Sequence, residues 1–293
     1  EAITAPIGEI SRSGFRRTLV GLKPAVSESI REQGRDDQDA GRPAERRDLD
    51  RLPGIEVGIG FSQFLDTPRY STGYAALWNT FGLMIETHML KPYDKRVYGT
   101  YELLRSMIAI TDKDAEQIKQ LRAQAFELFP AQETYAFDFK PDSSQVSQLD
   151  FRGYEADRIE SEVTGGKRLK YDTTRPFTRK VDYYDTFKAT RQVDMPRGYI
   201  VPQGWWPIVE LLELNNVEMQ EFRKDTLMQA RVYRIKDFKT RSRAYEGHYP
   251  HSDTQVTSSR QKVAVRRGDF FVPIDQRAAK YLMATLEPEA PDS

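Results

Sequence analysis

The chain has 293 residues, of which 39% are hydrophobic and 30% are charged, and it contains no cysteine. This composition fits a globular protein of about two domains, and it excludes disulfides, thiolate zinc ligands and a cysteine nucleophile. Basic and acidic residues both number 44, so no global charge favours nucleic acid, and no apolar window reaches the about 18 residues of a membrane span.

The first part of the chain predicts an exposed loop and then a strand. Residues 9–25 hold two short mixed apolar runs, and residues 31–51 are dense in Arg, Asp, Glu and Gln, which predicts an exposed, mobile loop. Residues 55–64 alternate apolar with small or polar side chains, a pattern typical of a strand. A short helix or turn is expected at residues 75–79.

An apolar run that ends in a carboxylate follows. Leu83–Ile85 come after a glycine and predict a buried strand of an α/β sheet, so Glu86 is expected at the strand end, where ligands of such sheets bind. Glu86 and His88 are two residues apart and share a face of an extended chain. A general base explains a carboxylate in this place, and so does a salt bridge with His88, Lys91 or Arg96.

Two amphipathic helices are expected after Pro92, which suits a first helical turn. Thr111 and Asp114 resemble a capping box at the start of the second helix, and Pro130 is expected to end it. Apolar residues recur at helical spacing in both segments: Val97, Tyr101, Leu104 and Ile108, then Ile118, Leu121, Ala125 and Leu128.

Beyond residue 130, aromatic and β-branched residues alternate between turn signals such as Thr164–Lys167, which predicts a mostly β domain. One helix is expected to open near Trp205 and to end at Asn215 and Asn216. Further strands are expected at 227–235, 262–265 and 270–274.

Three features of this second part have competing explanations. Trp205 and Trp206 suit either an aromatic platform for a sugar or peptide or an anchor between domains, and we expect packing. Residues 246–251 hold two histidines and a glutamate, but Pro250 disfavours a helix that would align them, so a surface loop is expected. Residues 234–243 are basic and suit nucleic acid or an exposed strand face, and the neutral net charge favours the strand face.

Several segments together resemble bacterial zinc carboxypeptidase-family proteins. The specific block comprises 68–74, 82–88 and 91–97, with the sequences PRYSTGY, GLMIETH and KPYDKRV. A second block comprises 245–249, 272–276 and 286–293, and it resembles the appended carboxyl-terminal region of the same bacterial subgroup. The similarity therefore extends over both halves of the chain.

The resemblance implies a mostly parallel sheet with flanking helices, one zinc ion and a glutamate that acts as general base on zinc-bound water. Glu86 matches that glutamate, and Tyr70 is a weaker match to a substrate-contacting tyrosine. Arg69 is expected to pair with a substrate carboxylate. His88 is expected to support Glu86 by a hydrogen bond, not to bind metal.

The zinc ligands are where the chain departs from the family. Its members bind zinc through a His-x-x-Glu pair and a third histidine upstream of the catalytic glutamate, whereas residues 1–85 contain no histidine. We therefore expect no zinc in this chain alone, and zinc in a complete parent protein. The chain is then either the carboxyl-terminal portion of a longer protein or a degenerate copy.

The expected architecture is α/β, with residues 1–130 as the carboxyl-terminal part of a carboxypeptidase-like domain and residues 131–293 as a mostly β accessory domain. The expected partners are a peptide or amide substrate and the missing amino-terminal half of the same protein, with no nucleic acid. The alternatives are a noncatalytic module that binds peptide, glycan or protein, and a pseudoenzyme. Composition leaves the compartment open, and the resemblance weakly favours a periplasmic or secreted protein.

Overall fold

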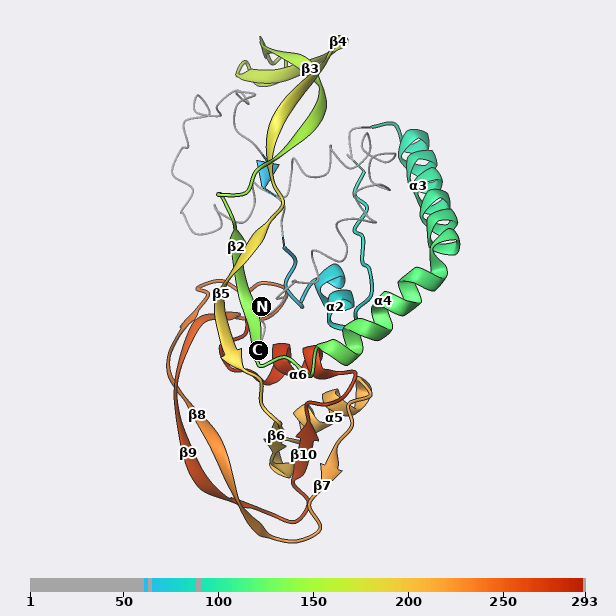
Figure 1. The fold of residues 1–293 in the computed structure, drawn as a ribbon. Helices are drawn as coiled ribbons and strands as arrows, with labels where there is room; N and C mark the ends of the chain where they lie inside the picture. The colour runs from blue at the N-terminus through green and yellow to red at the C-terminus, as the bar shows by residue number, and fades with distance from the viewer. Residues whose placement is uncertain (1–60, 63–64, 88–90, 292–293) are drawn as a thin grey trace. The chain divides into compact units, whose positions relative to one another are not determined.

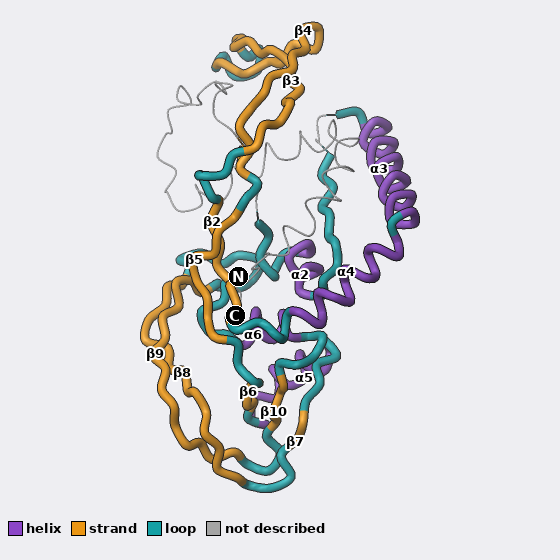
Figure 2. Tube along the Cα trace, viewed as in Figure 1, coloured by secondary structure: helices purple, strands orange, loops and turns teal. Residues whose placement is uncertain are grey.

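The computed structural model describes residues 61–62, 65–87 and 91–291, and these described residues are mixed, with 28% helix and 40% strand (Figures 1 and 2). The chain divides into two compact units built from interleaved segments. Of the described residues, the first unit contains 61–62, 85–87, 91–115 and 141–188, and the second contains 65–84, 116–140 and 189–291. The domain boundary at residue 130 stays a prediction. Of the strand expected at 55–64, the structure describes only β1 (Phe61–Ser62), and the rest lies outside the described residues.

The first unit holds a long hairpin and a long helix (Figure 1). Strand β3 (Ser147–Glu160) pairs antiparallel with β4 (Lys167–Tyr184), and β1 pairs in parallel with the end of β4. The turn between β3 and β4 confirms the predicted turn, because Gly165 has a φ of 68° and the Ser161 amide donates to the Gly166 carbonyl at 2.8 Å. Residues 161–166 alone connect β3 with β4, and so short a connection suits an antiparallel pair.

The helix predicted after Pro92 is confirmed as α3 (Tyr93–Lys113). It runs through Thr111, so the predicted capping box is wrong, and Asp114 is instead the C-cap residue of α3. The second predicted helix is confirmed as α4 (Ala115–Leu128), directly after this break. A single residue outside helical geometry therefore separates the two helices, and no loop with its own N-cap forms there.

The second unit holds short helices and three small sheets. Strand β10 lies between β6 and β7 and pairs antiparallel with both, β8 pairs antiparallel with β9, and β2 pairs with β5. Besides α4, its elements are α2 (Ser71–Leu77), β2 (Thr134–Pro141), β5 (Phe187–Asp194), β6 (Gly198–Val201), η2 (Gln203–Trp205), α5 (Trp206–Leu214), β7 (Gln220–Glu221), β8 (Thr226–Thr240), β9 (His251–Val265), β10 (Phe270–Pro273) and α6 (Ala279–Leu286).

The described sheets are small and mostly antiparallel: the pairs β3–β4, β8–β9, β6–β10 and β7–β10 are antiparallel, whereas β1 and β4 are parallel. These pairs do not support a mostly parallel sheet, which stays a prediction for residues 1–130. The strand predicted at Leu83–Ile85 is wrong, because these residues form no strand and Leu83 and Met84 are exposed. Parallel strands need a crossover of a dozen or more residues, whereas β3 and β4 are joined by residues 161–166 alone.

Helix α6 lies at the centre of the second unit's core. Its residues Leu282 and Met283 are fully buried, together with Leu212 of α5 and Val272 of β10. A helix whose residues are buried on all sides must be covered from several directions. The cover comes from α5, β6, β10, Leu77 of α2 and Phe129.

Helix α5 opens and ends where the sequence predicts, but its tryptophans are not packed. Pro207 lies in the first turn, and Asn216 follows the helix with a φ of 53°, as an asparagine after a helix end often does. Trp205 and Trp206 are 63% and 66% exposed, so the expected packing role is wrong. Within the described part of the chain, no helix has the length and apolar composition that crossing a bilayer requires.

Candidate functional site

The segment that precedes α2 is wound into a tight turn. The Tyr70 amide donates to the Thr67 carbonyl at 3.0 Å, and Thr72 Oγ1 donates a hydrogen bond to Asp66 Oδ2. Burial raises the pKa of the Asp66 carboxyl. A Cβ on Gly73 would lie 2.0 Å from the Thr67 carbonyl oxygen, so this turn requires glycine. The PRYSTGY motif therefore has a defined local fold.

Gly82 brings the GLMIETH motif against this turn. A Cβ on Gly82 would lie 2.9 Å from Thr72 Cα and 3.3 Å from the Ala75 Cβ, which leaves no room for a side chain. The backbone at Gly82 consequently packs directly on α2. The start of the second motif therefore packs on the helix of the first, and Glu86 lies four residues further along the chain.

Arg69 and Tyr70 lie directly before α2. The Arg69 side chain is exposed and that of Tyr70 is half-buried, with Tyr70 in extended geometry at the N-cap position of the helix. An exposed guanidinium beside a fixed helix start is able to make a bidentate contact with a carboxylate. Their role in binding substrate stays a prediction.

Glu86 lies in an exposed segment without strand structure. Water solvates an exposed carboxylate, so Glu86 needs neither a metal nor an ion-pair partner to offset burial. Among the described side chains, no ion pair with Glu86 is found, and Arg96 instead lies over the Tyr93 ring at 5.5 Å from its centroid. His88 lies outside the described residues. The role of Glu86 as a general base stays a prediction.

No group of three or more His, Asp or Glu side chains within the described ranges is arranged to hold a metal ion. The loop with His248 is exposed, as expected for a surface loop, and its backbone is closed by hydrogen bonds between Tyr245 and His248. His251 belongs to β9, where Nδ1 lies 2.9 Å from Thr240 Oγ1 and the ring meets Phe238 edge-on. His248 therefore closes a loop through its backbone, and the His251 ring contacts side chains of β8.

A buried lysine fixes the C-terminal end of α2. Lys280 of α6 is 7% exposed, its Nζ donates a hydrogen bond to Asn79 Oδ1, and Nζ lies 5.4 Å from the centroid of the Phe129 ring. Burial lowers the pKa of Lys280 to about 8. Arg122 of α4 donates from Nε to the Asn79 carbonyl at 2.9 Å. Two cations from different helices therefore converge on the residue that ends the PRYSTGY helix.

A second buried charge lies at the other end of α6. Glu287 is 2% exposed, and Tyr199 donates its hydroxyl to Glu287 Oε1 at 2.7 Å. Burial raises the pKa of Glu287, while hydrogen bonds from Tyr199 and Tyr233 act in the opposite direction. The pKa of Tyr199 is raised by burial and by the neighbouring carboxylate. These three side chains satisfy one another and stabilise the core.

Sequence reasoning missed both buried groups. Glu287 belongs to the second motif block, but nothing in its spacing predicts burial beside Tyr199 and Tyr233. Lys280 lies in an apolar stretch, and this is the one signal that could have predicted its burial. Asn79 is the last residue of the predicted short helix or turn, and asparagine is frequent at helix ends. Their partners are far away along the chain, with 88 positions between Tyr199 and Glu287 and 201 between Asn79 and Lys280.

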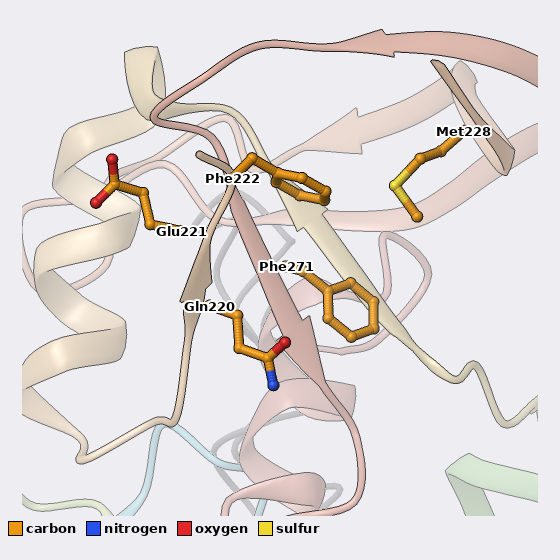
Figure 3. Close-up of a pocket in the computed structure, with 5 residues that line it drawn as sticks. All are labelled: Gln220, Glu221, Phe222, Met228 and Phe271. Carbon is orange, nitrogen blue, oxygen red and sulfur yellow. The ribbon is translucent and has the colours of Figure 1, made fainter. Parts of the chain in front are cut away.

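A shallow pocket of about 200 Å³ lies on the small sheet of β6, β10 and β7. It is lined by Gln220, Glu221, Phe222, Met228 and Phe271. Figure 3 shows Phe222, Phe271 and Met228 on one side of β7 and the Glu221 carboxylate on the other. The pocket interior is therefore apolar and brings no pair of catalytic groups together.

No family model matches the chain, and neither a curated protein nor a solved structure shows significant similarity to it.

Proposed function

We propose that the chain is the carboxyl-terminal portion of a zinc-dependent, metallocarboxypeptidase-like hydrolase of peptide or amide bonds, to which it supplies Glu86 as the general base. The observation that carries this proposal is the contact of Gly82 with Thr72 and Ala75. This contact brings the first residue of the second motif against the helix that begins within the first motif, and it supports the proposal that the two motifs act together. The mostly parallel sheet with flanking helices belongs to the proposed parent protein.

In this proposal the exposed Glu86 carboxylate takes a proton from the attacking water and returns it to the leaving amine. Arg69 binds the terminal carboxylate of the substrate, and Tyr70 contacts the substrate beside it. The described residues do not fit a zinc site, so the metal ligands are assigned to the missing amino-terminal half and no step of this chain depends on them.

The exposed apolar face of α3 supports the proposal that a further folded segment covers this helix in the parent protein. Leu103 is the one buried residue of this 21-residue helix. Large apolar side chains that recur at helical spacing remain exposed on it: Tyr93, Val97, Tyr101, Leu104 and Ile108. Monomeric proteins seldom expose such a stripe, which is typical of a surface that another chain segment covers.

A noncatalytic binding module is the second candidate. The exposed Trp205 and Trp206 favour it, because adjacent exposed tryptophans are typical of binding surfaces. This candidate needs neither zinc nor Glu86.

The test compares Glu86→Gln with the parental residue in the complete protein purified from its native source, after its intact mass and zinc content are measured. We expect a species heavier than this chain with one zinc, and loss of hydrolysis by orders of magnitude in the variant with folding unchanged. Glu127→Gln, an exposed glutamate of α4, is the matched control and is expected to keep full activity. Parental turnover in Glu86→Gln contradicts the proposal, and a protein of this mass without zinc favours the binding module.

A further inference from the structure

The exposed side of α5 carries tryptophan and glutamate and no cation. Residues 198–222 contain four glutamates and no lysine or arginine. Val209 and Leu212 face the core, whereas Trp206, Glu210 and Glu213 are exposed and recur at spacings of four and three, which places them on one side of the helix. Among the described side chains, neither glutamate has an ion-pair partner. We call Trp205, Trp206, Glu210 and Glu213 the acidic face.

Such a face suits a cationic ligand for two reasons. Carboxylates attract lysine and arginine, and the face of an exposed indole binds a cation within about 6 Å of its centroid. Leu214, which is 72% exposed, adds apolar surface beside the carboxylates. Protein interfaces typically combine an apolar core, enriched in aromatic residues, with a polar rim.

The hairpin of β8 and β9 carries the opposite charge. Residues 226–265 contain eight lysines and arginines against three aspartates and glutamates, a formal net charge of +5. Figure 1 shows β8 and β9 as a long two-stranded ribbon. From Arg234 to Thr240 every residue of β8 is exposed, including Ile235 and Phe238, so both strand faces meet solvent. We call residues 234–243 the basic arm.

Several cations of the basic arm are available for a partner. Lys239 pairs with Asp253 at 2.7 Å, and Arg241 lies over the Tyr245 ring. By contrast, no carboxylate in the described part of the chain pairs with Arg234, Lys236 or Arg243. The arm therefore presents cations and the apolar Ile235 and Phe238 together, as the acidic face presents carboxylates and indoles together.

We propose that the acidic face of one copy binds the basic arm of a second copy. The two surfaces are complementary in charge and both include exposed apolar side chains. The formal net charge of the whole chain is zero, so no long-range repulsion opposes the approach of two copies. A twofold pair of copies contains this contact twice, because each copy contributes both surfaces.

The test measures the mass of the purified chain by light scattering over a concentration series, at low salt and at about 0.5 M NaCl, where charge interactions between exposed groups are screened. We expect a mass that rises with concentration at low salt and falls to that of the monomer at high salt. The variants Glu210→Lys with Glu213→Lys, and Arg234→Glu with Lys236→Glu, are each expected to raise the dissociation constant about tenfold or more.

The combination of all four substitutions exchanges the charges of the two surfaces and is expected to restore association. Glu116→Lys with Glu127→Lys makes the same charge change on α4 and serves as the matched control, which should associate like the parental chain. Circular dichroism confirms the fold of each variant. A monomer at every concentration, association that the variants leave unchanged, or failure of the combined variant to associate each overturns the proposal. None of these readouts depends on zinc or on hydrolysis.

Discussion

Lys280→Met tests how the core tolerates a buried ammonium group. The Lys280 pKa falls from 10.5 to about 8 because α6 buries the side chain. Between these two pH values the unfolded chain holds one proton more than the folded chain, so the free energy of unfolding rises with pH in this window. One pKa unit corresponds to about 1.36 kcal/mol, so the full window contributes on the order of 3 kcal/mol.

The substitution removes the titrating group and keeps an unbranched side chain of similar length. We expect the free energy of unfolding of the parental chain to rise between pH 7 and 9.5, and that of Lys280→Met to stay flat. The variant also leaves Asn79 Oδ1 without its donor, which costs about 1–3 kcal/mol at all pH values. The slope with pH, and not the stability at one pH, therefore reports the buried charge.

Urea unfolding followed by tryptophan fluorescence measures this slope, because Trp78 stacks on Tyr281 of α6 at a centroid distance of 5.8 Å. The series stops at pH 9.5, because burial raises the pKa of Tyr135 to about 12. At higher pH a buried phenol stays protonated in the folded chain and not in the unfolded chain, so the free energy of unfolding falls with pH instead of rising. Lys262→Met replaces an exposed lysine of β9 and is the control. A flat parental curve, or an equal rise in Lys280→Met, refutes the reasoning.

Two further predictions concern the tight turn and the buried carboxylate. Gly73→Ala places a Cβ 2.0 Å from the Thr67 carbonyl oxygen and is expected to lower the unfolding midpoint in urea. The control is Gly99→Ala in α3, where a Cβ meets no atom within 4 Å, and it is expected to raise the midpoint slightly. Equal midpoints of the two variants would contradict the turn geometry. The stability of Glu287→Gln relative to the parental chain is expected to be higher at pH 7 than at pH 4.5. The raised pKa of Glu287 makes the parental chain lose stability as the pH rises above the carboxyl pKa of the unfolded chain. Tyr199→Phe is expected to lower the free energy of unfolding by about 1–3 kcal/mol at pH 7. The absence of a pH-dependent difference between Glu287→Gln and the parental chain would show that the carboxyl is not shifted.

Helices α3, α4 and α5 were predictable because their causes are local, whereas α6 (Ala279–Leu286) was not predicted. The apolar spacing from Val97 to Ile108 defines α3, and Pro207 and Asn216 mark the two ends of α5 within a few residues of the structure. The turn at Gly165 was predictable for the same reason, since glycine adopts its positive φ without steric cost.

The strand expected at Leu83–Ile85 shows where local pattern fails. Three apolar residues after a glycine fit a buried strand, an exposed segment or a partner contact equally well, and only neighbouring strands decide between them. The structure leaves the segment exposed after Gly82, so the prediction about Glu86 depends on its motif and not on burial.

The sequence by itself determined helices α3, α4 and α5, the turn at Gly165 and the motifs from residue 68 to residue 97, because apolar spacing, helix-end residues and glycine geometry act over a few residues. Only the tertiary structure decided that Lys280 and Glu287 are buried, that Gly82 packs on Thr72 and that Trp205 and Trp206 face solvent. Burial and exposure depend on segments far apart in the chain, and their pairing follows from the packing of the whole core.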